Sequence, residues 1–231
     1  MKKRFLLPIF ILACIFIGIA FGIQRSGGVN MNKSEKIKLL TPNYTSDTSV
    51  EEALLKRRSI RNYKDETMTV EKLSQLLWSA QGVTNSKGFR TAPSAGALYP
   101  LELYVAIGDV EDISAGVYRY VPDTHELVNT LEGDKRIELY NAALRQPYVR
   151  YAQIVIIFTA VYERITRKYR GRGAQYVHME VGHASQNVYL QAVSLGLGTV
   201  VIGAFDDEDV SDALGLKDNE APLALMPVGA V

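Results

Sequence analysis

A chain of 231 residues is long enough for one domain and an appendage, and its 47% apolar residues suffice for a sizeable core. The formal net charge of +1 leaves no overall field that would favour nucleic acid or an acidic partner, so nucleic-acid binding is not expected. The one cysteine, Cys14, excludes an internal disulfide. The three histidines lack the spacing of a metal site, and no metal is expected.

Residues 1–23 are predicted to be a signal peptide or a membrane anchor. Three cations at positions 2–4 precede an apolar run, Phe5–Ile23, which approaches the roughly 20 residues that span a bilayer as a helix. The length favours an uncleaved anchor, the small residues at positions 20 and 22 allow a cleaved signal, and the residues up to Cys14 resemble a lipoprotein signal. Because the cations precede the run, the domain is expected outside the cytoplasm, membrane-anchored or exported.

The segment 24–48 is rich in Ser, Asn, Gly, Thr and Lys and is predicted to be a flexible linker. The folded domain is expected over residues 49–231. Its first helix begins at Ser49, which opens a capping box, and runs to about Arg58.

The rest of the domain alternates between strands and helices. Thr69 can cap a second helix, which Gly82 ends. We then predict strands at 101–107, 117–121, 154–161, 199–202 and 223–228. Helices are predicted at 135–144, 175–195 and 206–215, and a basic loop at 164–172. One sheet with flanking helices, of the α+β or α/β class, follows.

Three segments carry candidate chemistry, and the first is a cluster of cations and a hydroxyl after the first helix. It contains Arg57, Arg58, Ser59 and Arg61. Guanidinium groups bind phosphate oxygens through paired hydrogen bonds, and a serine hydroxyl can add another. A solvated basic helix end would have the same composition, because cations complement the helix dipole there.

The second segment is a run of small residues between two prolines, Pro93 and Pro100, that includes Ser94, Ala95 and Gly96. Small side chains let a flat ligand approach the backbone closely. An ordinary tight turn before a strand remains the alternative.

The third segment joins the long helix to a strand end. The helix contains Gly182, Ala184 and Ser185, small residues against which a partner helix or a cofactor can pack closely. Farther along, the Gly203-Ala204 pair leaves backbone open to a ligand.

Together, R-R-S-x-R, P-S-x-G-A-x-x-P and E-x-G-H-x-x-Q-N followed by L-G-L-G resemble the nitroreductase superfamily. Within it, the chain is most similar to the SagB-type dehydrogenases, which include the azoline oxidases of peptide heterocycle biosynthesis. The resemblance covers about residues 50–230. It implies an α+β nitroreductase-like fold, with a central, mostly antiparallel sheet flanked by helices and FMN bound at a homodimer interface.

The same resemblance implies the site residues. Matching the motifs residue by residue gives FMN phosphate and ribityl contacts at Arg57, Arg58, Ser59 and Arg61, and isoalloxazine contacts at Pro93, Ser94, Ala95, Gly96, Val201, Ile202, Gly203 and Ala204. Lys168 and Tyr169 match a pair that the azoline oxidases use for proton removal. The alternative for this pair is an exposed loop among arginines.

Two departures from the family pattern are visible. Ala97 stands where many nitroreductases have Asn, as expected of the SagB-type branch. The C-terminal residues carry no Lys or Arg to reach the phosphate, so phosphate binding would depend on the first motif, helped by the 164–172 segment.

The resemblance implies an FMN-dependent oxidoreductase that transfers a hydride to or from a small molecule or a peptide heterocycle. NAD(P)H is the expected electron donor, and it would bind transiently because the sequence has no G-x-G-x-x-G motif. A non-catalytic, membrane-tethered flavin-binding or interaction module is the alternative. A domain that consumes flavin as its substrate is a third reading.

Overall fold

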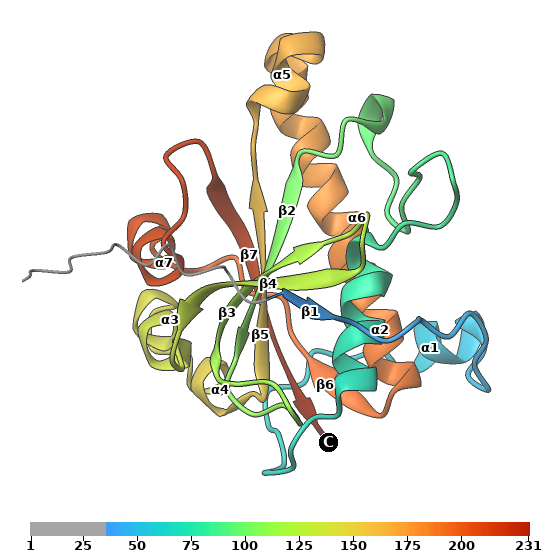
Figure 1. Cartoon of the computed structure of the whole chain (residues 1–231), viewed down its shortest axis with the longest axis vertical. Coiled ribbons are helices and arrows are strands. Elements are labelled where there is room, and N and C mark those ends of the chain that lie inside the picture. The colour runs from blue at the N-terminus through green and yellow to red at the C-terminus, as the bar shows by residue number, and fades with distance from the viewer. Residues whose placement is uncertain (1–35) are drawn as a thin grey trace, which may run out of the picture. The chain divides into compact units, whose positions relative to one another are not determined.

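The computed structural model describes residues 36–231, which build a seven-stranded sheet with helices on both faces (Figure 1). The strand order is β1-β4-β3-β2-β5-β7-β6, and every pair is antiparallel. The strands are β1 (Lys36–Lys38), β2 (Leu101–Ile107), β3 (Gly116–Val121), β4 (Glu126–Glu132), β5 (Ile154–Ala160), β6 (Leu197–Thr199) and β7 (Ala221–Ala230). The predicted antiparallel sheet flanked by helices is confirmed.

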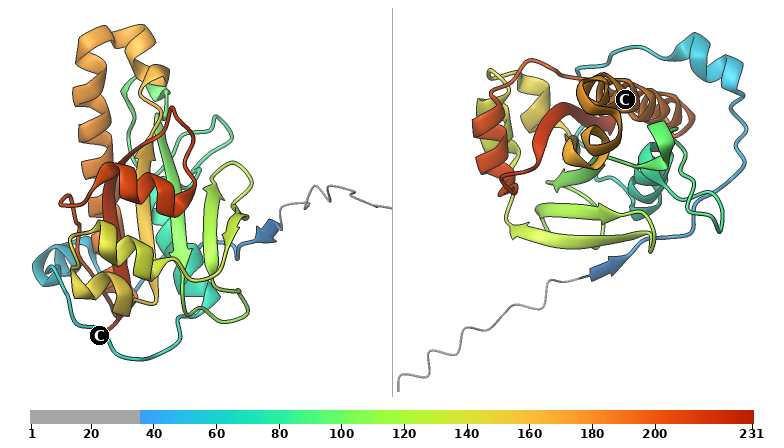
Figure 2. Two further views of the ribbon diagram at one scale, coloured as in Figure 1. Left: turned by 90° about the vertical axis from the view of Figure 1, so that its left-hand side faces the viewer. Right: turned by 90° about the horizontal axis from the view of Figure 1, so that it is seen from above.

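Two helical layers cover the sheet (Figure 2). The helices are α1 (Val50–Lys56), α2 (Val70–Gln81), α3 (Arg136–Ala142), α4 (Pro147–Tyr151), α5 (Glu163–Tyr169), α6 (Gly173–Ser194) and α7 (Asp207–Leu214), with short 3₁₀ turns η1 (Ala95–Ala97) and η2 (Arg170–Arg172). Alternate residues of β5 enter different cores: Ile156 packs with α2 and α6, whereas Ile157 packs with α3, α4 and α7. This alternation is the two-residue period of a strand that is buried on both faces.

The predicted helix caps form as expected. Ser49 accepts a hydrogen bond from the Glu52 amide at 3.1 Å, and Thr69 accepts one from the Lys72 amide at 3.4 Å. Asp206 caps α7, which ends at Gly215 with a φ of 59°. These side chains satisfy amides that the first turn of a helix leaves unpaired.

Some elements differ from the sequence prediction. Strand β4 and helix α4 were not predicted, because each has a short and weak apolar pattern. The predicted basic loop at 164–172 is wrong, since α5 and η2 occupy it. In α5, Ile165 is buried while the neighbouring cations face outward, which is the pattern of a short amphipathic helix. The predicted strand 199–202 ends at Thr199, and Ile202 adds only an isolated bridge to Leu225.

The predicted linker 24–48 contains structure at its C-terminal end. Residues 36–38 form β1, which pairs with β4, and Leu39 is 4% exposed. The sheet therefore begins before the predicted domain start at Ser49.

The predicted signal or anchor at residues 1–23 lies outside the described residues. Within residues 36–231, no helix is both long and apolar enough to cross a membrane. The prediction of a membrane-anchored or exported protein with an extracytoplasmic domain is corrected on this finding.

Close backbone packing at β6 generates a first prediction. A methyl group added at Gly198 would lie 2.4 Å from Cγ1 of Val231 and 2.6 Å from Cγ2 of Ile60. We expect Gly198→Ala to lower the free energy of unfolding by about 1–3 kcal/mol, measured by urea denaturation. Gly171→Ala is the control, because nothing lies within 4 Å of its added methyl group. An equal loss of stability in both variants would contradict this account.

Candidate functional site

The first and third motifs meet at Tyr189, a buried residue of α6. Its hydroxyl oxygen accepts the Val201 N–H at 2.8 Å and lies 3.0 Å from the Ser59 hydroxyl. The guanidinium carbon of Arg57 lies 5.1 Å from the centroid of the same ring. Tyr189 thereby fastens Ser59 and Arg57 beside the strand end. The sequence analysis missed this residue, although it follows the Gln-Asn pair of the helix motif by two positions.

The other end of the 201–204 strip is held from α4 and the residue before it. Gln146 donates a side-chain hydrogen bond to the Ala204 carbonyl at 3.0 Å and also contacts the Tyr148 hydroxyl. The guanidinium carbon of Arg61 lies 5.7 Å from the Tyr148 ring centroid. We call the surface formed by Arg57, Ser59, Arg61 and residues 201–204 the arginine face.

Two predicted contacts do not point to this face. Arg58 donates to the carbonyls of Leu55 and Arg57 at 3.0 and 2.7 Å, and it lines a cavity of about 190 Å³ that reaches Val231. Ile202 is 4% exposed, and its backbone N–H and C=O are both bonded to Leu225. Neither group of the Ile202 backbone is therefore open to a ligand.

The neighbouring residues Gly203 and Ala204 do leave backbone donors open. Both are exposed, and neither amide has a protein acceptor in the described part of the chain. A methyl group added at Gly203 would meet nothing within 4 Å. Open amides beside guanidinium groups suit an anionic ligand rich in acceptor oxygens and nitrogens, as the phosphate and ring of FMN are. The residues present therefore fit this cofactor.

The second motif lies beside the predicted proton-transfer pair. We call residues 93–99 the 93–99 loop. A methyl group added at Gly96 would lie 2.7 Å from the Tyr169 hydroxyl and 3.0 Å from Nζ of Lys168. Lys168 is exposed, whereas Tyr169 is half-buried and packs edge-on against Tyr176 with ring centroids 5.1 Å apart. The structure thus brings the predicted pair and the small-residue loop together.

The 93–99 loop has an unusual backbone. Gly96, Ala97 and Tyr99 have φ values of 65°, 53° and 45°. The left-handed region is costly for residues with a side chain, so the surroundings must hold the loop in place. One restraint is internal, because the Tyr99 amide donates to the Ser94 hydroxyl at 2.9 Å.

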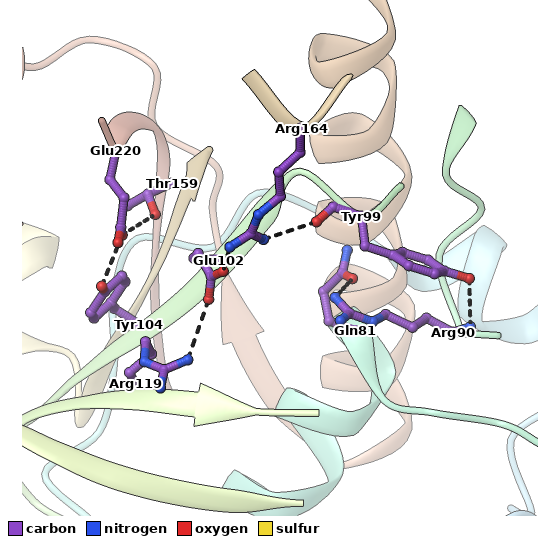
Figure 3. A network of polar contacts seen from close by, with 9 residues as sticks. All are labelled: Gln81, Arg90, Tyr99, Glu102, Tyr104, Arg119, Thr159, Arg164 and Glu220. Carbon is purple, nitrogen blue, oxygen red and sulfur yellow. Dashed lines mark hydrogen bonds and ion pairs between the residues drawn. The ribbon is translucent and has the colours of Figure 1, made fainter. Parts of the chain in front are cut away.

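A polar network anchors the loop and α5 to the sheet (Figure 3). Arg164, at the start of α5, donates to the Tyr99 carbonyl at 3.1 Å and pairs with Glu102 of β2. Glu102 also pairs with Arg119 of β3 at 3.5 Å. This ion pair fixes the start of α5, and Lys168 lies one helical turn later.

Glu180 of α6 is a buried carboxylate behind the loop. It is 1% exposed and forms no ion pair in the described residues, and Ser94 and Gln81 are the hydrogen-bonding side chains nearest to its oxygens. Burial raises the pKa of Glu180 from 4.5 to about 7, and the nearby Ser94, Arg90 and Gln81 oppose that rise only in part. A group with this environment can change its charge near neutral pH.

The two groups of predicted contacts lie at different levels of α6. The arginine face is attached at Tyr189, whereas the 93–99 loop lies near Glu180 and Tyr176. Tyr189 lies nine positions after Glu180, a rise of roughly 14 Å at 1.5 Å per residue. Figure 1 shows α5 and α1 at opposite ends of α6. The arginines of α5 and η2 therefore lie away from Arg57 in the same chain.

The model of the Nitroreductase family matches residues 54–230. A Methanocaldococcus jannaschii protein named as a nitroreductase is 51% identical over 183 residues, covering 79% of this chain and 91% of its own length. A crystal structure of a Ralstonia eutropha protein, also named as a nitroreductase, matches with a TM-score of 0.76 and 30% identity, covering 86% of this chain and 91% of that one.

Two further relatives have named activities. The microcin B17-processing protein of Escherichia coli is 28% identical over 179 residues, which cover 71% of this chain and 61% of that protein. The FMN reductase (NADPH) of Bacillus subtilis is 24% identical over 192 residues, covering 77% of this chain and 64% of that protein. The predicted resemblance to the nitroreductases and their SagB-type relatives is confirmed.

Glu180 generates a prediction about stability and pH. Below pH 4.5 both the folded and the unfolded chain hold the proton; between pH 4.5 and about 7 only the folded chain does. Stability should therefore fall as pH rises through this range, by about 3 kcal/mol in total for a pKa change from 4.5 to about 7.

Glu180→Gln should remove this dependence. Urea denaturation at pH 5 and pH 8 measures it, and the exposed Glu163→Gln serves as the matched control. The same pH slope in wild type and Glu180→Gln would show that Glu180 does not titrate in this range.

Proposed function

The chain belongs to the nitroreductase family, and on this premise we propose that it is an FMN-dependent oxidoreductase. Family membership supports an oxidoreductase that uses flavin, and the relative named as an FMN reductase supports FMN. The observation that carries the proposal is the arginine face. There, Arg57 and Ser59 are fastened by Tyr189 beside the open amides of Gly203 and Ala204.

In this proposal each part of the face has a separate task. Arg57, Ser59 and Arg61 hold the phosphate and ribityl chain, because guanidinium groups pair with phosphate oxygens. The amides of Gly203 and Ala204 face the ring and stabilise negative charge on it. Bound FMN supplies two-electron hydride chemistry. Arg58 and the Ile202 side chain stay outside the contact set, because they point elsewhere.

The separation of the two contact groups supports a homodimer. If one FMN touches both groups, the 93–99 loop of a second copy covers the ring held by the first. The outer side of α6 is open to such a partner: Met179 is 56% exposed, and a methyl group added at Gly182 would meet nothing within 4 Å. Of the three small residues predicted on this helix, Gly182 faces outward, whereas Ala184 and Ser185 are buried within the same protomer.

The position of Lys168 and Tyr169 favours a second candidate activity within the same class. An exposed amine and a phenol beside Gly96 are placed to accept a proton from a substrate lying over the loop. The microcin B17-processing relative favours a peptide heterocycle as that substrate, and a small molecule reduced by NAD(P)H is the alternative. The two differ in the direction of electron flow.

A visible absorption spectrum tests the proposal. The purified full chain, mixed with FMN and freed of excess, should show flavin bands that differ from those of free FMN. Bleaching by NADPH or NADH under anaerobic conditions would identify a nicotinamide-reducible enzyme. Bands that persist would favour a dehydrogenase that draws electrons from its substrate. Absence of bands after reconstitution would refute the cofactor and favour a non-catalytic interaction module.

Tyr189→Phe tests the arginine face. The change removes the hydroxyl that contacts Ser59 and accepts the Val201 amide, while the ring beneath Arg57 remains. We expect FMN affinity to fall about tenfold, which corresponds to the loss of one to two hydrogen bonds. Fluorescence titration of FMN measures it. Tyr44→Phe, at a 73% exposed site, is the control, and an unchanged dissociation constant in Tyr189→Phe would argue against the assignment.

Lys168→Ala and Tyr169→Phe test proton transfer. Both variants should bind FMN as the wild type does, because neither residue contacts the arginine face of its own chain. Oxidation of a thiazoline-containing peptide with an artificial electron acceptor should slow about 10²–10⁴-fold if the pair acts as a general base. Lys217→Ala provides a charge-matched control. Full peptide oxidation in both variants would exclude this role.

A further inference from the structure

The buried polar groups around Glu180 are incompletely paired. Nε2 of Gln81 and Nε of Arg90 are buried donors without an acceptor, and both oxygens of Glu180 are buried acceptors without a donor. A buried polar group without a hydrogen-bond partner destabilises the fold, because it has lost its hydration without compensation. A cluster that contains unpaired donors and unpaired acceptors together has a second arrangement available, in which they pair with one another.

The present arrangement gives Arg90 to other partners. Its Nη1 donates to Oε1 of Gln81 at 3.1 Å, and its guanidinium carbon lies 4.4 Å from the Tyr99 ring centroid (Figure 3). The Arg90 amide also donates to the Tyr99 hydroxyl at 3.2 Å. Arg90 therefore supports the 93–99 loop, and it forms no ion pair with Glu180, whose nearest hydrogen-bonding side chains are Ser94 and Gln81.

The charge of Glu180 decides between the two arrangements. On the elements around it, α2 contributes the neutral Gln81, and the 90–99 segment contributes Ser94 and one charge, Arg90. A protonated carboxyl interacts only weakly with a guanidinium group, whereas an ionised carboxylate in a buried site attracts it strongly. Pairing with ionised Glu180 would draw Arg90 away from Tyr99 and Gln81.

A movement of Arg90 would affect the site through Tyr99, which is part of the 93–99 loop. Its amide holds Ser94, its carbonyl accepts from Arg164, and its left-handed backbone needs support from its neighbours. Moving Arg90 off the Tyr99 ring removes part of that support. The 93–99 loop and the start of α5 would then shift together.

We infer that Glu180 is a positioning residue for the 93–99 loop: its protonation keeps Arg90 on Tyr99 and Gln81, and its ionisation moves Arg90 to Glu180 and loosens the loop. The inference rests on the proposed function only where it links this loop to FMN. There it makes flavin affinity dependent on the charge of a residue that does not touch the flavin.

Trp78 reports on the loop without any flavin. It is the single tryptophan of the chain, and its carbonyl accepts from the Thr91 hydroxyl at 3.2 Å, next to Arg90. In the flavin-free full chain, Trp78 fluorescence should change between pH 6 and pH 8. Glu180→Gln should abolish the change, while the exposed Glu163→Gln should retain it. A change that persists in Glu180→Gln, or no change in the wild type, would overturn the inference.

Arg90→Gln gives a second reading if Glu180→Gln does not fold. It keeps the carboxyl but removes the cation that ionised Glu180 would attract, so the fluorescence transition between pH 6 and pH 8 should disappear. A transition that persists in Arg90→Gln would overturn the inference.

FMN titration completes the test. The wild type should bind FMN at least fivefold more weakly at pH 8 than at pH 6, and Glu180→Gln should bind it equally at both. A pH response shared by both proteins overturns the inference while leaving the proposed function intact. Failure of every variant to bind FMN, together with a Trp78 transition that depends on Glu180, refutes the cofactor and supports the inference about the loop.

Discussion

The packing of α6 against the sheet sets the position of both halves of the candidate site. Val177, Ala184, Val188 and Ala192 bury one side of this helix in the core it shares with α2 and the central strands. Tyr189 follows directly in that buried pattern and carries the arginine face. A continuous helix is rigid over this length, so the spacing between the two halves is a property of the fold, independent of the loops that complete them.

The same burial creates the electrostatic constraint at Glu180. Residues on the inner side of a helix are expected to be apolar, and a carboxyl there loses its hydration. The chain is nearly neutral overall, with a net charge of +1, so this effect is local: it arises from the burial of one carboxyl, and the neighbouring Arg90 opposes it only in part. Charge is likewise divided within α5: Arg164 is bound to Glu102, whereas Lys168, one turn later, remains exposed.

Much of the fold could be predicted from local signals. Ser49, Thr69 and Asp206 act as caps through contacts within a few residues, and β2 and β5 are long apolar runs whose meaning does not depend on distant partners. Strand β4 could not be found in this way, because its pairing with β1 and β3 stabilises a segment of weak pattern. Helix α5 was not predicted, because its many cations gave the segment the composition of a basic loop.

The site was predictable by segment but not by side chain. The motifs located the arginine face and the loop, yet they could not show that Arg57 faces Tyr189 while Arg58 turns back to the helix carbonyls. Nor could they show that Ile202 is directed into the core. Side-chain direction in an irregular segment depends on tertiary contacts, and no sequence period specifies it.

The distance between the arginine face and the 93–99 loop also has a genetic consequence. For a dimer of the proposed kind, each site takes the face from one chain and the loop from the other. A chain with a damaged face and a chain with a damaged loop would each be inactive alone. When the two are mixed, one of the two sites in a mixed dimer combines an intact face with an intact loop, so two defective alleles would complement each other.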